Sequence, residues 1–126
     1  MKKSCVPLAL TCLLCTVSIA AADDDFKVTY HVERTASKLI SLDQCTDLIE
    51  RLAKEAGYRV AVSRHPGQLG VISGGSAGSG SFISHCISVD DKTVSVIQGL
   101  DYGSQKGPVG EFADRTHQAL ISATVK

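Results

Sequence analysis

Two cysteines, Cys45 and Cys86, are the residues of this chain whose type most directly suggests chemistry. Dithiol oxidoreductases usually keep their two cysteines close in sequence, with one thiolate at the start of a helix where it exchanges quickly. Cys45 does fall in the first turn of a predicted helix, but Cys86 lies 41 positions further along, in a predicted strand. Cys45 also belongs to the apolar stripe of its helix. The spacing therefore favours a structural disulfide over a redox centre.

Histidine, a frequent general base and metal ligand, occurs four times and always in isolation. The four are His31, His65, His85 and His117. No two are three or four residues apart on one helix, and none has a carboxylate at the spacing of a metal ligand. The sequence therefore predicts no metal site, no cofactor and no catalytic residue, although a zinc site built from distant strands stays open. Gly78-Ser79-Gly80 lacks the Gly-x-Ser-x-Gly spacing of a nucleophilic serine.

A run of glycine and serine from Ser73 to Gly80 is the third candidate for chemistry. Glycine-rich loops can bind phosphate through backbone N–H groups when a helix follows them. Here a strand follows the run, and the lysine of a P-loop is missing. We predict a flexible hairpin loop over Gly74–Gly80, in keeping with the flexibility of Gly/Ser segments.

The first 22 residues have the pattern of a secretory signal peptide. A basic start and an apolar run over residues 6–20 precede three alanines that end at Ala22. We expect cleavage after Ala22, which leaves one domain over residues 23–126. The run is too short and too polar to persist as a transmembrane anchor, and its cysteines lack a lipid-attachment pattern. We therefore expect a periplasmic or secreted protein without a membrane anchor.

Cleavage would remove three of the five cysteines and leave Cys45 and Cys86. Exported chains meet an oxidising environment, so an even number of cysteines predicts one intrachain disulfide. A bond that closes a loop of this length would contribute about 4 kcal/mol to the free energy of unfolding in the chain-entropy model.

Composition excludes several partners. Removal of two lysines with residues 1–22 leaves 11 basic against 13 acidic residues, a net charge of about −2. No basic stretch suited to nucleic acid is present. With three Phe, three Tyr and no Trp, the core must consist mainly of Val, Ile, Leu and Ala.

The elements that must position these residues begin with a strand and a helix. An alternating pattern over Phe26–Arg34 predicts a half-buried strand. Phe26, Val28, Tyr30 and Val32 share one of its faces, and Lys27, Thr29, His31 and Glu33 share the other. Ser41 and Gln44 have the spacing of a capping box, apolar residues follow at helical spacing, and Gly57 supplies a stop. These signals predict a helix over residues 42–56.

The remaining residues predict four strands and a second helix. The strands are Tyr58–Arg64, Leu69–Ser73, Ser81–Val89 and Thr93–Leu100, and the helix is Pro108–Thr124. On Ser81–Val89, Phe82 and Cys86 share one face whereas Ile83 and Ile87 share the other, so we expect both faces to be partly covered. The order β-α-β-β-β-β-α predicts an α+β fold, in which two helices pack on one side of an antiparallel sheet.

Several short segments give the chain a resemblance to a known family. They are Tyr30–Arg34, Ser41–Cys45, Pro66–Leu69, Val71–Gly75, Gln98–Tyr102 and Phe112–Arg115. In them the chain resembles a family of small exported bacterial proteins with no assigned function. The resemblance covers nearly all of residues 26–124 and implies export and a compact domain. It brings no catalytic residues.

These observations predict a non-enzymatic interaction or binding module with a periplasmic or extracellular protein as its partner. Exposed polar residues gather in predicted loops on a rigid scaffold, where binding usually resides. Arg64, His65 and Tyr102 are the side chains there that could anchor a partner. The alternative is a small enzyme that uses a histidine (His31, His85 or His117) with a nearby carboxylate as acid and base. A concave pocket that joins such a pair would favour the enzyme.

Overall fold

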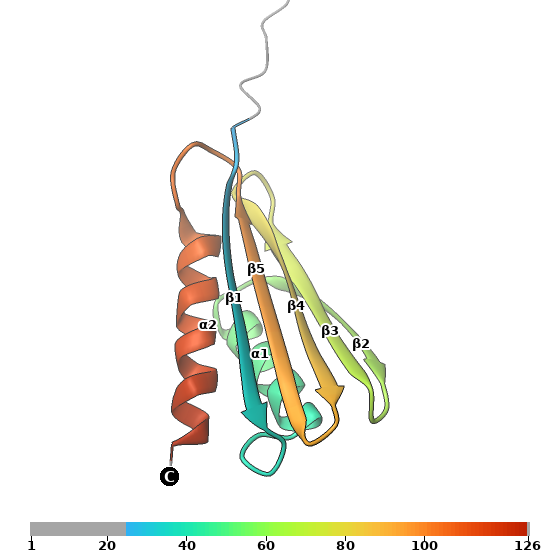
Figure 1. The fold of residues 1–126 in the computed structure, drawn as a ribbon. Coiled ribbons are helices and arrows are strands. Elements are labelled where there is room, and N and C mark those ends of the chain that lie inside the picture. Colours follow the sequence, from blue (N-terminus) through green and yellow to red (C-terminus); the bar gives the residue numbers. More distant parts are fainter. Residues whose placement is uncertain (1–24, 126) are drawn as a thin grey trace, which may run out of the picture.

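The computed structural model describes residues 25–125, and the predicted signal peptide lies outside them. Along the chain the elements are β1 (Lys27–Ala36), α1 (Leu42–Glu55), β2 (Arg59–His65), β3 (Leu69–Ser76), β4 (Gly80–Val89), β5 (Lys92–Asp101) and α2 (Pro108–Thr124), as Figure 1 shows. This is the predicted order β-α-β-β-β-β-α. Within the described residues, no helix is both long enough and apolar enough to cross a membrane.

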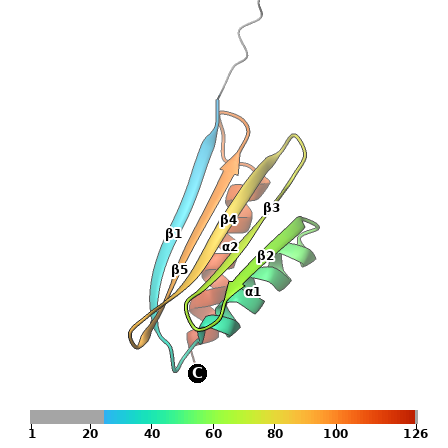
Figure 2. The same cartoon turned by 90° about the vertical axis from the view of Figure 1, so that its right-hand side faces the viewer.

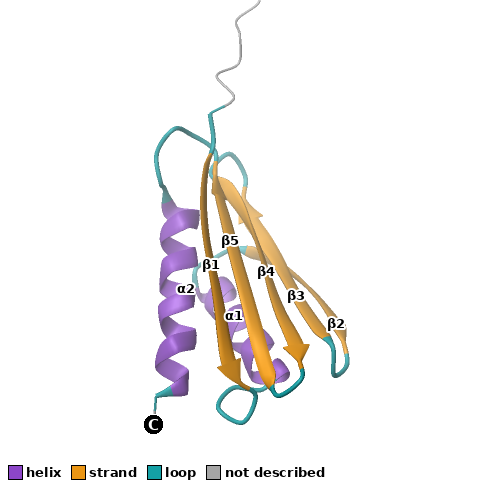
Figure 3. Cartoon of the chain, in the orientation of Figure 1, coloured by secondary structure: helices purple, strands orange, loops and turns teal. Residues whose placement is uncertain are grey.

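The five strands form one antiparallel sheet in the order β1-β5-β4-β3-β2. Three consecutive hairpins connect β2, β3, β4 and β5 in chain order. Strand β1 pairs with β5 and forms the edge of the sheet opposite to β2. Both helices lie on the same side of this sheet (Figures 2 and 3). Helix α1 packs against β2, β3 and β4, and α2 packs against β1 and β5. The predicted fold class is therefore confirmed.

Helix α1 begins and ends where its sequence signals place it. The Ser41 side chain accepts a hydrogen bond from the Gln44 backbone N–H, and the Gln44 side chain accepts one from the Ser41 backbone N–H. This is the predicted capping box, which satisfies donors that the helix itself leaves free. At the other end Gly57 has φ of 82°, a conformation that favours glycine.

The core lies between the helices and the sheet. Cys45 of α1 is bonded to Cys86 of β4, and both are fully buried, which confirms the predicted disulfide. Phe82 and Phe112 pack with their ring centroids 4.9 Å apart, and both also contact the Tyr58 ring. Ile49, Ile72, Ile97, Val109 and Leu120 complete most of the core. Aliphatic side chains thus supply much of the buried surface, as the composition predicts.

The N-terminus of α2 is capped by a residue outside the helix, which the sequence around Pro108 does not predict. Gly107 at the N-cap offers no side chain, but the buried carboxylate of Asp101 accepts hydrogen bonds from the backbone N–H groups of Val109 (3.0 Å) and Gly110 (2.8 Å). A negative charge at a helix N-terminus is stabilising, since free N–H groups and the helix dipole both favour it. A side chain at Gly110 would collide with this carboxylate, which explains the glycine there.

The prediction for the Gly/Ser run is wrong in part. β3 extends to Ser76 and β4 starts at Gly80, so only residues 77–79 form the connection. The first glycines of the run instead serve close packing within the sheet. A Cβ at Gly74 would lie 2.3 Å from the Arg59 carbonyl oxygen and 2.9 Å from the Phe82 ring. The missing side chain at Gly74 leaves room for the Phe82 ring to pack against β3. The glycines at the start of this run therefore serve packing and do not indicate a flexible segment.

Candidate interaction surface

The sheet has one face that neither helix covers, which we call the open face. It consists of the even-numbered residues 28–36 of β1 and 92–100 of β5, with the odd-numbered residues 81–89 of β4, 69–75 of β3 and 59–65 of β2. The opposite face carries Cys86 and the core. In Figure 2 both helices lie behind the sheet, so this bare side has no neighbour among residues 25–125.

The open face is rich in large apolar side chains. On β1, Tyr30 is 67% exposed, Val32 53% and Val28 48%. Ile83 and Val89 of β4 are also exposed. Between them lie half-buried aliphatic side chains, namely Val94, Val96 and Leu100 of β5, Ile87 of β4, and Leu69 and Val71 of β3. Scattered apolar residues are normal on a protein surface, but a contiguous apolar field usually marks an interaction site.

The orientation of β1 accounts for much of this surface. The alternating pattern of β1 shows which of its residues share a face. A half-buried strand, as predicted, would normally turn its apolar residues toward the core. In the structure the polar residues face α2 instead, because α2 turns a polar flank toward β1. His31 of β1 contacts Asp114 and His117 of this helix. The apolar half of β1 is therefore left on the open face.

Charge on the open face is confined to its margins. None of its positions in the described strands holds Asp or Glu. Arg34 and Lys92 lie at one end of the sheet, and Arg59 lies at the opposite end of the far edge strand. His85 is the one titratable side chain near the middle, on the central strand β4. The centre of the face could therefore be desolvated without burying a permanent charge.

A hollow interrupts the face toward one end. It has a volume of about 300 Å³ and is lined by Val28, Ser81, Ile83, Gln98 and Leu100, together with Phe82 and Gly99. Most of these are open-face residues of three adjacent strands. An apolar side chain from a partner would fit such a depression better than a charged one, because little polar surface lines it.

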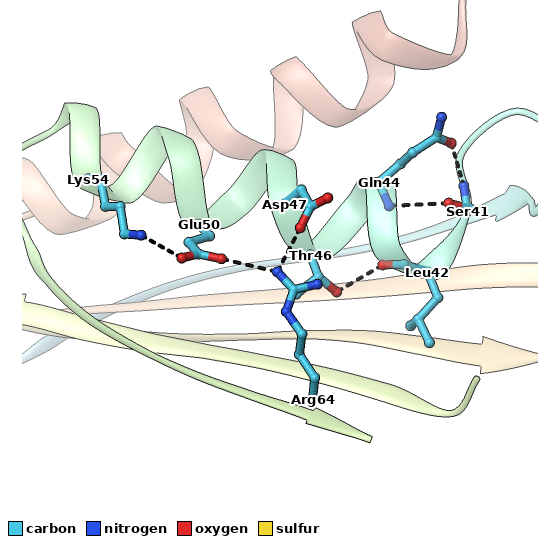
Figure 4. A network of polar contacts seen from close by, with 8 residues as sticks. All are labelled: Ser41, Leu42, Gln44, Thr46, Asp47, Glu50, Lys54 and Arg64. Carbon is cyan, nitrogen blue, oxygen red and sulfur yellow. Dashed lines mark hydrogen bonds and ion pairs between the residues drawn. The ribbon is translucent and has the colours of Figure 1, made fainter. Parts of the chain in front are cut away.

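The side chains predicted as partner anchors do not form one surface. Arg64 of β2 points toward α1, on the covered face of the sheet. It donates hydrogen bonds to Asp47 (2.6 Å) and Glu50 (3.1 Å) of this helix, as Figure 4 shows. The bond to Asp47 is the main cause of a raised pKa at Arg64. His65 ends β2 beside Leu69, whereas Tyr102 follows β5 at the opposite end of the sheet, where its hydroxyl contacts Ser81. The structure thus separates Tyr102 from the other two.

The structure does bring two of the four histidines together, on the covered side of the sheet. The rings of His31 (β1) and His117 (α2) stack with centroids 4.3 Å apart and planes within 4° of parallel. His31 Nε2 lies 2.9 Å from Asp114 Oδ1, and Lys106 pairs with the other carboxylate oxygen. The sequence could not predict this cluster, since His31 and Asp114 are 83 residues apart.

Electrostatics in this cluster follow from burial and neighbouring charge. The pKa of Asp114 is lowered, chiefly by the hydrogen bond from Lys106 and then by that from His31. The pKa of His117 is lowered by burial first and by the charge of His31 second, and its Nδ1 is buried without a hydrogen-bond partner. No group of three or more metal-ligating side chains occurs among the described residues. Among residues 25–125, neither His31 nor His117 lines any of the five best-formed surface hollows.

Sequence comparison matches residues 25–125 to DUF6180, a family of unknown function. The chain belongs to this family. The match spans the whole described domain, including all five strands and both helices. No curated protein matches the chain. The predicted resemblance to a family without an assigned function is thereby confirmed.

Membership of DUF6180 assigns no role to any residue. The site must therefore be judged on the geometry of this chain alone. That geometry offers two regions, the open face with its apolar field and the His31–His117 cluster beneath α2. The first is wide and lies on the bare side of the sheet, whereas the second consists of a few side chains in a packed seam.

Proposed function

We propose that this DUF6180 member is an exported, non-enzymatic interaction module, and that it binds another protein through the open face. The observation that carries this proposal is the exposure of large apolar side chains across one side of a disulfide-bonded sheet. Such a face is costly to leave in water at about 25 cal/mol per Å² of apolar surface. A protein that covers it would recover this free energy on binding.

The disulfide between Cys45 and Cys86 supports the proposal that the protein is exported. Bonds of this kind persist in oxidising compartments and are rare where thiols are kept reduced. The expected cleavage after Ala22 would place the mature N-terminus shortly before β1 at Lys27. The mass of the exported protein tests this part of the proposal. A chain that retains residues 1–22, or that carries acyl groups, would contradict it.

Site-specific photo-cross-linking in the producing cell tests the interaction surface. A photoreactive benzoylphenylalanine at position 30 replaces one exposed ring with another in the open face. The matched control carries the same group at Gln118, an exposed residue of α2. We expect a protein adduct from position 30 and none from position 118. Equal adducts from both positions, or none from position 30, would refute the open face as the binding surface.

A second candidate function is favoured by one observation, the contact of His31 Nε2 with Asp114 at 2.9 Å. A carboxylate that orients an imidazole is the arrangement of a general base. This arrangement would support the alternative of a small enzyme. Hydrolysis of an activated ester above the buffer rate that is lost in His31→Gln, but kept in His65→Gln, would favour it over the interaction module.

A further inference from the structure

The open face presents one surface that can pair with itself. Sheets of equal twist pack face to face with their strands nearly aligned, and the side chains between them form a dry core. Most oligomers of soluble proteins are two-fold symmetric and use the same patch on both subunits. We infer that the open face binds a second copy of this chain, sheet against sheet, about a two-fold axis that passes close to His85. This inference rests on the proposed function and names its partner.

The size of the open face suits a stable dimer. Five strands spaced by about 4.8 Å, with about 3.3 Å per residue, give a face of about 24 by about 30 Å. Contact over this area would bury about 700 Å² per copy, or about 1,400 Å² in total. Specific protein interfaces bury about 1,200 to 2,000 Å², whereas incidental contacts bury less than about 800 Å². The face is therefore as large as a dimer needs.

Charge permits two copies to meet. After the expected cleavage the chain has 11 basic and 13 acidic residues, a net charge of about −2, so long-range repulsion between copies is weak. Arg34 and Lys92 lie at one end of the sheet and Arg59 at the diagonally opposite corner. A two-fold axis along the strands would place Arg34 over the partner's β2 end near its His65, not over Arg59. An axis across the strands would place Arg34 over the start of the partner's β1. Neither arrangement puts one permanent cation opposite another.

The absence of acidic side chains on the open face argues against a basic partner. Complementary charge is what steers unlike proteins together, and the strand positions of this face hold no carboxylate. The acidic residues nearest to it are Asp90 and Asp91 in the turn between β4 and β5, and Asp91 is already paired with Lys92. Its centre is aliphatic on β3, β4 and β5, and an aliphatic surface of matching twist is what a second copy supplies. The two faces would then bury each other's valine and isoleucine side chains.

His85 makes the proposed dimer sensitive to pH. It lies near the midpoint of the central strand β4, so any two-fold that overlays the faces brings two copies of it together. Its neighbours on the open face are Val71 of β3, Val96 of β5, and Ile83 and Ile87 of β4. No titratable side chain faces it from these strands, and His65 lies at a corner. Proton uptake by both central imidazoles would therefore place two unpaired cations in the interface.

Molar mass measured by light scattering, over a dilution series from about 100 µM to about 1 µM, tests the inference on the purified protein. We expect twice the mass of one chain for the wild type. Val96→Lys puts a charge at the centre of the open face and should give the mass of one chain. Leu39→Lys is the matched control, because Leu39 is an exposed apolar residue outside the sheet, and it should remain dimeric.

Three results would overturn the inference. They are a monomeric wild type at the highest concentration, a dimer that survives Val96→Lys, and assemblies that grow beyond two copies. Melting curves show whether Val96→Lys still folds, and Val32→Lys near the edge of the same face provides a second disrupting variant. In a His65→Gln background, where His85 is the one histidine left on the open face, lowering the pH from about 7.5 to about 5.5 should raise the dimer dissociation constant at least about tenfold, and adding His85→Leu should abolish this change.

The cross-linking experiment separates this inference from the proposed function. An adduct at position 30 with twice the mass of the chain supports the dimer. An adduct of another mass supports an interaction module and refutes the second copy as its partner. With no adduct at all, both proposals fail together.

Discussion

The two faces of one sheet follow different rules in this protein. On the covered face, β4 contributes Phe82, Ser84 and Cys86 and β5 contributes Ile97, and the helices bury these side chains almost completely. On the open face, the same strands carry Ile83, Ile87 and Val96 with nothing above them among the described residues. Both faces are therefore apolar, although one face of an exposed antiparallel sheet is normally polar. The difference teaches that hydropathy alone does not distinguish a core from a binding surface.

Breaking the disulfide should have the largest effect on the covered face. We expect Cys45→Ala and Cys86→Ala each to lower the free energy of unfolding by about 2 to 5 kcal/mol, because the unfolded chain regains the freedom of a 41-residue separation. The double variant should lose little more than either single variant, since both delete one bond. Chemical denaturation measures these values. Two reactive thiols in the native protein would contradict the prediction.

Adjacent residues on β5 compare the two faces directly. Ile97 is fully buried beneath the helices, whereas Val96 is half-buried on the open face. We expect Ile97→Ala to cost about 2 to 4 kcal/mol through lost burial and a cavity. Val96→Ala should cost less than about 1 kcal/mol in the separated chain. Denaturation at low protein concentration tests this, because it removes any contribution from association. Equal losses at both positions would show that the two faces do not differ in this way.

Removing the remote cap of α2 should have an intermediate effect. We expect Asp101→Asn to lower the free energy of unfolding by about 1 to 3 kcal/mol, because an amide has one acceptor oxygen whereas the carboxylate accepts from Val109 with Oδ1 and from Gly110 with Oδ2. Asp90→Asn, at an exposed turn between β4 and β5, is the matched control. Thermal melting compares them. A similar small loss in both variants would show that the Asp101 carboxylate does not cap the helix.

The pH dependence of stability should be the smallest effect, and it concerns the seam between β1 and α2. Burial lowers the pKa of His117 below its ordinary value of 6.5, so the unfolded chain takes up this proton first as the pH falls. Stability should therefore decrease as the pH drops below about 6.5, until the folded protein binds the proton as well. The lowered pKa of Asp114 acts in a separate range, because its contribution is lost only as the pH falls below 3.8.

His117→Gln should flatten the stability profile near neutral pH, whereas His65→Gln, at an exposed strand end, should leave it unchanged. Denaturation over a pH series at low protein concentration measures this without interference from association. A wild-type slope that survives His117→Gln would assign the titration to another group.

Much of the fold was predictable because its signals are local. Ser41 and Gln44 fix the start of α1, and Pro108 fixes the start of α2, so both helices begin where the sequence indicates. The disulfide followed from cysteine count. Strand ends were less certain, since Gly74 and Gly75 look like loop residues but serve close packing in β3.

The candidate surface was harder to predict, because it depends on which face the helices cover. Alternation on β1 groups Val28 with Tyr30 and Val32, but it says nothing about the flank of α2 that lies across the strand. The pattern on β4 was the better signal, since Ile83 and Ile87 lie opposite Phe82 and Cys86. Contacts such as His31 with Asp114, and the reach of Arg64 to Asp47, depend on tertiary packing alone.

The bond between Cys45 and Cys86 also encloses part of the chain. β2, β3 and the exposed hairpin at residues 66–68 all lie between its two ends. A protease that cut this hairpin would leave two fragments held together by one covalent link. The nicked protein would keep its mass in a denaturing gel without reductant and separate only after reduction. In an environment rich in proteases, the bond would thus preserve the connection between helix α1 and the centre of the sheet after the chain itself has been cut.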